Sequence, residues 1–123
     1  MKHRVPAVLL LLLVTACAGV KAREHILWPS VKSTWPPVKE DIELGLQGSS
    51  ASPSVMQAMN QIEGAVRADD YTLLKGANYF VLEPLARSGV RERVTRGMSE
   101  GVAASLDERN TQFSAAMTEL TKR

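Results

Sequence analysis

Residues 28–48 read "WPSVKSTWPPVKEDIELGLQG" and contain the phrase WPxVK twice, at an offset of seven residues. Both tryptophans of the 123-residue chain lie in this repeat. Proline is favoured at the first position of a helix, where its missing N–H costs nothing, so each Trp-Pro pair predicts a helix entrance. The repeat therefore predicts two helix starts in close succession.

Pro36 is expected to separate these two helices. Because a proline disfavours helical backbone at the residue before it, a first helix of about two turns is expected to stop at Trp35. The second helix is expected to start at Pro37 and to end near Gly48, which offers a C-cap. Apolar residues recur every four positions along it, at Val38, Ile42 and Leu46. The stretch thus predicts a short helical lead-in followed by a regular helix.

The segment "GSSASPS" at residues 48–54 is a linker that ends in a helix signal. Ser52 can cap a helix and Pro53 can occupy its first position. After them, apolar residues step by four, three and four positions, which is the spacing of one helical face; they are Val55, Met59, Ile62 and Val66.

Residues 71–86, "YTLLKGANYFVLEPLA", are apolar on nearly every side. Such a segment predicts a central helix covered on more than one face, with Asp69 or Asp70 as its cap. Pro84 removes an interior hydrogen bond, so this helix is expected to end near Leu82 and another to begin at Pro84. A single kinked helix is the alternative.

The last third of the chain continues the helical pattern. Four apolar residues follow at four-residue spacing after Pro84, at Val90, Val94, Met98 and Val102. A capping box at Ser105 then predicts a last helix that runs to the end of the chain. The expected fold is all-α, a small helical bundle of about four helices with a short Trp/Pro-rich helical lead-in, over residues 28–123.

The first residues have a different composition. Residues 1–17, "MKHRVPAVLLLLLVTAC", combine a basic start, an apolar run of about ten residues and small residues at the end, in the order typical of a secretory signal. The run is too short to span a bilayer, which takes about 20 helical residues. Cys17, the only cysteine, follows Val14, Thr15 and Ala16.

This VTAC sequence resembles the lipobox of bacterial lipoproteins. The resemblance covers the leader only and implies cleavage before Cys17 with attachment of a diacylglycerol to its thiol. It predicts a signal peptide at residues 1–16, an acylated cysteine and tether at residues 17–27, and a membrane partner through the anchor on Cys17. The alternative is an ordinary leader cut after Ala18, which would remove the thiol.

Charge excludes one class of partner. The chain has 15 Lys and Arg residues against 13 Asp and Glu residues, and Lys2 and Arg4 belong to the leader. The remaining chain is balanced, so it lacks the basic excess that nucleic-acid binding requires.

The sequence predicts no catalytic residue, no metal site and no cofactor. His25 is the only histidine outside the leader, whereas a zinc or catalytic site needs several converging ligands. The carboxylates of Glu40, Asp41, Asp69 and Asp107 each suit a helix start or a cap. The motifs GxSxG, GxxxxGK[ST] and GxGxxG do not occur.

Three residues are candidate contacts with a membrane or a protein partner: Trp28, Arg87 and Arg91. Trp28, near the tether, is expected to be partly exposed, whereas Trp35 is expected to pack on the bundle. Arg87 and Arg91 are neighbours on one helical face, and Arg93 and Arg96 form a second pair about half a turn away. A solvated helix surface is the simpler interpretation of these charges, and contact with lipid headgroups or an acidic partner is the functional one.

These patterns predict a lipid-anchored helical protein of the bacterial cell envelope that acts as a non-catalytic interaction or accessory module. In a Gram-negative host, Ala18 and Gly19 after the cysteine resemble a signal for the outer membrane, facing the periplasm. The alternative function is binding of a small apolar ligand or lipid between the helices, with adaptable side chains as walls; these are Met56, Met59, Phe80, Met98 and Met117.

Overall fold

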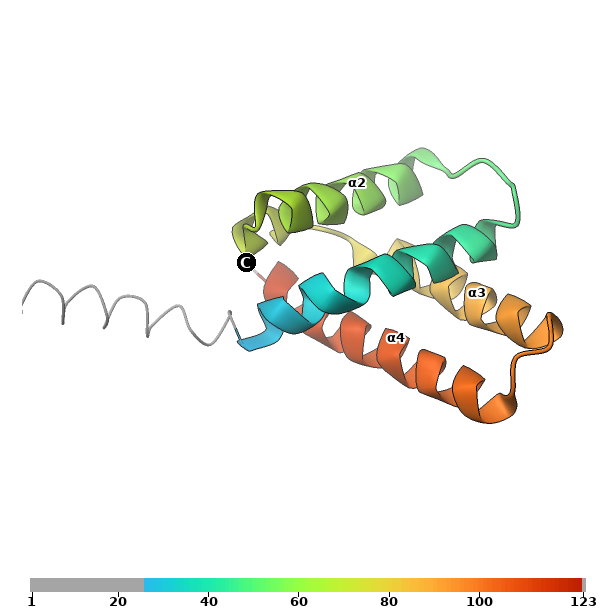
Figure 1. Cartoon of the computed structure of the whole chain (residues 1–123). Coiled ribbons are helices and arrows are strands. Elements are labelled where there is room, and N and C mark those ends of the chain that lie inside the picture. The colour runs from blue at the N-terminus through green and yellow to red at the C-terminus, as the bar shows by residue number, and fades with distance from the viewer. Residues whose placement is uncertain (1–25, 123) are drawn as a thin grey trace, which may run out of the picture.

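The structure, a computed structural model, describes residues 26–122 and contains four α-helices and no strand in that range. They are an N-terminal helix at residues 26–46, α2 (Pro53–Ala68), α3 (Glu83–Thr95) and α4 (Glu100–Thr121). Successive helices run in alternating directions and pack side by side (Figure 1). The prediction of a small all-α helical bundle is confirmed.

The N-terminal helix is continuous, so the predicted stop at Pro36 is wrong. The lead-in and the second predicted helix form one element that carries both copies of the repeat. Tertiary packing explains the difference, because the tryptophans and the apolar residues between and after them share one buried face. Pro36 lies on the exposed side, where water can reach carbonyl groups that a proline leaves unpaired.

The α2 helix begins as its sequence predicts. The Ser52 side chain accepts a hydrogen bond from the backbone N–H of Val55 at 3.3 Å, and Pro53 is the first helical residue. The helix ends at Asp69, whose φ of 52° is in the left-handed region. The Asp69 carboxylate accepts hydrogen bonds from the N-terminal helix.

The predicted central helix over residues 71–82 does not form. Two short 3-10 turns replace it, η1 (Tyr71–Leu74) and η2 (Tyr79–Val81), on either side of Gly76 with a φ of 78°. The Asp70 side chain accepts from the N–H of Thr72 and holds η1 as a tight turn. Buried and exposed positions alternate along the segment: Leu74 and Tyr79 enter the core, whereas Phe80 is 65% exposed.

The predicted capping box at Ser105 is also wrong. Gly97, with a φ of 102°, ends α3, and Ser99 caps α4 by accepting from the N–H of Val102 at 3.3 Å. The valines at 94 and 102 therefore flank a turn and are exposed. The expected start near Pro84 is confirmed, since α3 starts one residue earlier.

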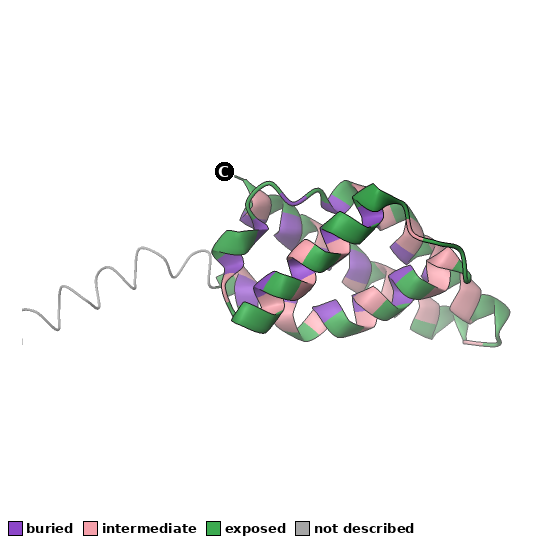
Figure 2. Cartoon of the chain, turned by 90° about the horizontal axis from the view of Figure 1, so that it is seen from above, coloured by how far each residue is buried: buried purple, intermediate pink, exposed green. Residues whose placement is uncertain are grey.

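The core lies between the four helices, where the buried faces meet (Figure 2). Phe113 of α4 stands at its centre, with the Trp35 ring stacked at 5.8 Å and the Tyr79 ring edge-on at 5.2 Å between centroids. The Tyr79 hydroxyl makes no hydrogen bond within residues 26–122, and burial raises the pKa of this phenol. Trp35 is 1% exposed, which confirms that it packs on the bundle.

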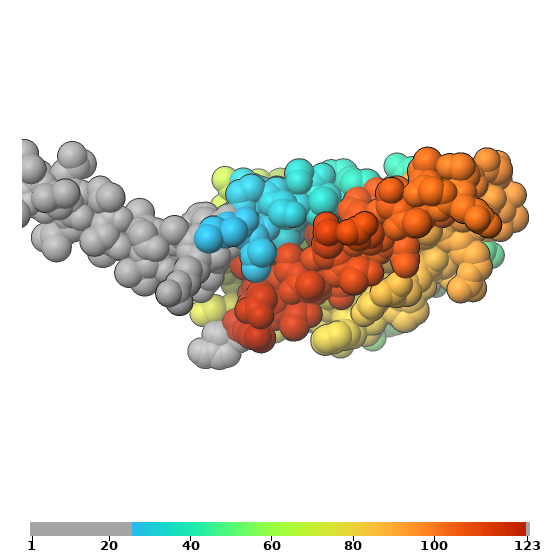
Figure 3. Space-filling model, turned by 90° about the horizontal axis from the view of Figure 1, so that it is seen from below, coloured from blue at the N-terminus to red at the C-terminus, as the bar shows by residue number. Residues whose placement is uncertain are grey.

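The two ends of the bundle are formed by different segments of the chain. The first described residues of the N-terminal helix lie beside the end of α4, and the turn between α3 and α4 lies at the opposite end (Figures 1 and 3). We call the first the near end and the second the far end. Among residues 26–122, no helix combines the length and apolar character needed to cross a membrane.

Candidate functional site

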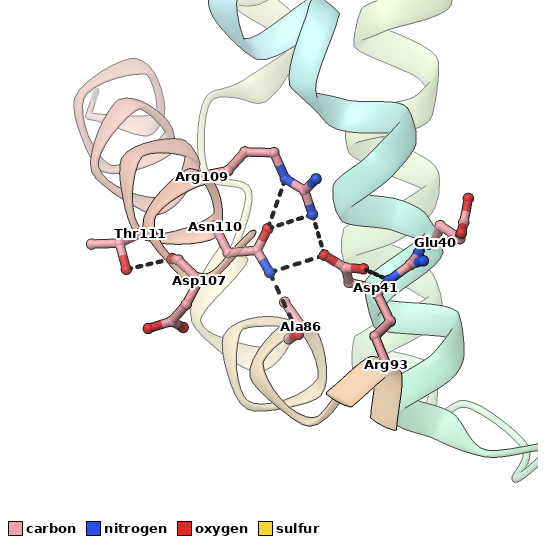
Figure 4. Close-up of polar contacts among 8 residues, drawn as sticks. All are labelled: Glu40, Asp41, Ala86, Arg93, Asp107, Arg109, Asn110 and Thr111. Atoms are coloured by element: carbon pink, nitrogen blue, oxygen red, sulfur yellow. Dashed lines mark hydrogen bonds and ion pairs between the residues drawn. The ribbon is translucent and has the colours of Figure 1, made fainter. Parts of the chain in front are cut away.

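A buried carboxylate at the centre of three helices is the most unusual polar feature of the bundle. Asp41 of the N-terminal helix is 0% exposed. One of its oxygens accepts from Nε of Arg93 at 2.7 Å, and the other accepts from the guanidinium of Arg109 and from the Asn110 amide, the latter at 3.2 Å. Figure 4 shows these side chains converging on Asp41 from α3 and α4. We call Asp41, Arg93, Arg109 and Asn110 the Asp41 cluster.

Two glycines bring the N-terminal helix and α3 close enough to form this cluster. A Cβ built on Gly89 of α3 would lie 1.7 Å from the carbonyl oxygen of Asp41. One turn along each helix, a Cβ on Gly45 would lie 2.0 Å from the carbonyl oxygen of Leu85. The contact is reciprocal, because each helix places a glycine against the backbone of the other. Only residues without a side chain permit this approach.

The third helix enters the cluster through adjacent residues of α4. The Arg109 guanidinium donates both to Asp41 and to the side-chain oxygen of Asn110. The Asn110 amide donates to Asp41 and, at 3.5 Å, to the carbonyl oxygen of Ala86 in α3. Asn110 is 3% exposed. Its amide therefore joins all three helices in the interior.

The chemistry of the cluster suits holding helices together. A nucleophile or general base needs a lone pair that a substrate can reach, whereas Asp41 is 0% exposed and both of its oxygens accept from cationic or amide donors. Arg93 also pairs with Glu40. The hydrogen bond with Glu40, and then that with Asp41, raise the pKa of the Arg93 guanidinium above its usual value. Within the part of the chain that the structure describes, no three His, Cys, Asp or Glu residues group as metal ligands.

The WPxVK repeat forms a second set of polar contacts, toward α2. In the first copy, the Trp28 indole N–H and the Lys32 ammonium both donate to one oxygen of Asp69, each at 2.8 Å. The Lys32 ammonium also lies 5.8 Å from the centroid of the Trp28 ring. The Trp and Lys of each copy are four residues apart, so they share one side of the helix.

The second copy makes the same pair of contacts with a carboxylate six residues earlier in the sequence, Glu63 of α2. The Trp35 indole donates to Glu63 at 2.9 Å and Lys39 donates to the same oxygen at 3.2 Å. These two hydrogen bonds, the indole first, lower the pKa of the Glu63 carboxyl. Each copy of the repeat therefore binds one carboxylate of α2, through an indole at the edge of the core and a lysine at the rim.

Of the predicted contact residues, Trp28 needs a correction. It is 2% exposed and its ring lies edge-on to Tyr71 at 6.3 Å, so the expectation of partial exposure is wrong. The carboxylate of Asp69 and the ring of Tyr71 provide the partners that the sequence could not indicate for an indole near the tether. A side chain this buried presents almost no surface to a membrane or a protein.

Arg87 and Arg91 lie on α3, apart from Trp28. Arg87 pairs with Asp107 of α4 at 2.8 Å and with Glu83 at 3.3 Å. Arg91 is exposed and forms no ion pair within residues 26–122. The rest of the predicted arginine cluster separates, because Arg93 enters the Asp41 cluster and Arg96 pairs with Glu92. Cys17 lies outside the described residues.

The side chains proposed as walls of an apolar site do not face one interior space. Met117 is 0% exposed, whereas Met56 and Phe80 are 53% and 65% exposed. Met98 borders a hollow of about 370 Å³ at the far end, together with Leu44, Glu40, Arg93 and Arg96. A smaller hollow, of about 220 Å³, lies between α2 and the segment with η2, and is lined mostly by polar residues.

The importance of Asp41 was missed in the sequence. The residue suits the first turn of a helix that begins at Pro37, and that interpretation hid its true position in the middle of a longer helix. The available signal was its register: Asp41 follows Val38 by three positions and precedes Gly45 by four, which places it beside the apolar face. No family model, curated protein or solved structure matches the chain significantly.

Proposed function

We propose that this protein is a lipid-anchored component of the bacterial cell envelope whose helical domain acts as a non-catalytic interaction or accessory module. The observation that carries the proposal is the sequence around Cys17. A basic start, an apolar run and the residues VTAC, with the only cysteine of the chain at the cleavage position, are the features that a lipoprotein signal requires.

The polar chemistry of the domain supports a module rather than an enzyme. Its buried carboxylate is engaged by two arginines and an amide that tie three helices together. The carboxylates of Glu63 and Asp69 are engaged by the repeat. These groups hold the bundle in shape, and the exposed surface is what the domain offers to other molecules.

Mass spectrometry of the membrane fraction tests the anchor. The full chain is expressed in a bacterial host, and the expected N-terminal peptide of the mature protein begins at Cys17 and carries a diacylglycerol. The matched variant Cys17→Ser is expected to lose both the lipid and the retention of the protein in membranes. A mature chain that begins at Gly19 without lipid would disprove the anchor.

Crosslinking in intact envelopes tests the interaction module. Arg91 is the candidate contact that is both exposed and unpaired within the described range. We expect a defined envelope protein to crosslink to the wild type and to be lost with Arg91→Glu, while Arg67→Glu on α2, where the arginine side chain is 80% exposed, leaves it unchanged. Recovery of the same protein with Arg91→Glu would exclude this side of α3 as the contact.

A further inference from the structure

The first described residue of the N-terminal helix, Ile26, lies at the near end of the bundle (Figure 1). The number of residues before it sets an upper limit on the distance between the near end and the proposed anchor. Nine residue steps separate Cys17 from Ile26. Because an extended chain spans at most about 3.3–3.6 Å per residue, Ile26 lies within about 30 Å of an acylated Cys17. The near end therefore stays within reach of the bilayer surface, and the far end lies at the opposite end of the N-terminal helix (Figure 1).

Exposed apolar and basic side chains meet at this end. Ile26 is 72% exposed and Leu73 of η1 is 47% exposed. Lys75 is exposed and forms no ion pair within the described part of the chain, whereas Lys122, exposed at the end of α4, pairs with Glu119 of that helix at 3.0 Å. An apolar side chain beside a lysine is the combination that binds an interface between water and an anionic lipid.

Four contacts hold the turn that carries Leu73 and Lys75 at the near end. The Gln61 amide of α2 donates to the carbonyl oxygens of Leu73 and Lys75, at 3.1 and 3.2 Å. The N–H of Gly76 donates to the carbonyl oxygen of Thr121 in α4. The contact of Trp28 with Tyr71 adds the start of the N-terminal helix. The turn is thus fixed to three helices at the near end.

We propose that the near end, through Ile26, Leu73, Lys75 and Lys122, docks on an anionic bilayer surface and holds the bundle in a fixed orientation. This inference rests on the proposed anchor. The anchor confines the domain to the membrane, and the lysines then contribute about 1 kcal/mol each near anionic headgroups. Lys21 and Arg23, against Glu24, add basic charge to the sequence between the anchor and the bundle.

The far end provides a matched control for apolar exposure. Val102, in the first turn of α4, is 48% exposed, against 47% for Leu73. If exposure alone determined membrane contact, the two positions would behave alike. If the tether and the lysines determine it, only position 73 contacts lipid.

An environment-sensitive fluorophore on a single thiol distinguishes these cases. The full chain is produced with Leu73→Cys or Val102→Cys, and acylation of Cys17 leaves the introduced thiol as the one available for labelling. Each protein is placed in vesicles of phosphatidylethanolamine with phosphatidylglycerol, or in vesicles of phosphatidylcholine. Quenching by acrylamide, which is uncharged, then reports exposure to water.

The two lysines together favour the docked state by about 30-fold, about fivefold each. On anionic vesicles the label at position 73 is therefore expected to be quenched several-fold less than the label at position 102. The difference is expected to disappear in phosphatidylcholine and in the double variant Lys75→Glu, Lys122→Glu. Equal quenching at both positions, with the protein acylated and retained on anionic vesicles, would overturn the docking surface and leave the anchor intact. A free Cys17 thiol with no retention would overturn the anchor and the docking surface together.

Discussion

The N-terminal helix joins the bundle through two interfaces with different chemistry. Toward α2, the repeat places an indole and a lysine on each of two carboxylates, and these ion pairs remain partly exposed, with Glu63 at 33% and Asp69 at 66%. Toward α3 and α4, glycines allow close contact around a carboxylate that is fully buried. One helix thus uses charge at the rim on one side and in the interior on the other.

The difference lies in how much each charge depends on its partners. A carboxylate at the rim that loses a partner regains water, and the loss is small. A buried carboxylate has no such substitute, and its removal leaves the opposite charges without compensation. The interface around Asp41 should therefore dominate the stability of the bundle, although the repeat is the more visible feature of the sequence.

The largest effect is expected for Asp41→Ala. Removing one partner of a buried ion pair costs about 3–5 kcal/mol, and here two guanidinium groups and an amide lose their acceptor. Urea unfolding followed by tryptophan fluorescence measures the loss. Glu43→Ala, at an exposed position of the same helix, is the control and should change stability by less than about 0.5 kcal/mol. Equal midpoints for the two variants would show that Asp41 is not the centre of this interface.

The next effect tests the close contact of the N-terminal helix with α3. Gly89→Ala places a methyl group against the backbone at Asp41, and overpacking of this kind costs about 1–3 kcal/mol. Gly64→Ala is the matched control, because nothing lies within 4 Å of its added Cβ. It should stabilise α2, by up to about 1 kcal/mol. The same sign of change for both alanines would contradict the close approach.

The all-α fold class could be predicted because helical periodicity is visible within single segments of the sequence. The N-cap at Ser52, the proline at the first helical position and the apolar steps after them predicted α2 from local chemistry alone. The N-terminal helix was predicted as two pieces, because the cost of Pro36 is local whereas the burial that offsets it comes from other helices. The same limit explains η1 and η2, where alternation between core and surface resembled a fully covered helix.

The site was less accessible to sequence reasoning. The repeat was evident, but its partners Glu63 and Asp69 lie in α2 and at its C-cap, and no sequence pattern distinguishes them from other surface carboxylates. The Asp41 cluster joins residues that are 52 and 68 positions apart. Only the register of Asp41 beside an apolar face signalled burial, and that register depends on a helix continuing through two prolines.

An intermediate effect is expected for Glu63→Gln, at the interface of the repeat with α2. Loss of the charge on the acceptor should cost about 1 kcal/mol near neutral pH. The folded-state pKa of Glu63 is lowered, so its contribution is present above the unfolded pKa and disappears as pH falls through the folded value. Unfolding midpoints in urea between about pH 6 and about pH 3 should therefore fall less steeply for Glu63→Gln than for the wild type.

Glu119→Gln is the control for loss of an exposed carboxylate. Glu119 pairs only with Lys122 among the described residues, and its side chain is 59% exposed. Near neutral pH its free energy of unfolding should match that of the wild type within about 0.5 kcal/mol. A Glu63→Gln slope that equals that of the wild type would mean that the indole and the lysine do not depend on the charge of Glu63.

The smallest effects test whether each copy of the repeat binds its own carboxylate. Lys32→Met and Lys39→Met each remove a partly exposed ion pair, so each should cost about 0.2–1 kcal/mol. The coupling energy between each lysine substitution and Glu63→Gln is more informative than the cost of either substitution alone.

Lys39 donates to Glu63, so Lys39→Met and Glu63→Gln should be non-additive, because the second change removes a partner that is already lost. Lys32 donates to Asp69, so Lys32→Met and Glu63→Gln should add within about 0.3–0.5 kcal/mol. Double-mutant cycles from urea unfolding at low salt measure both. Equal coupling of the two lysines to Glu63 would show that the copies share one acidic surface of α2 instead of binding separate carboxylates.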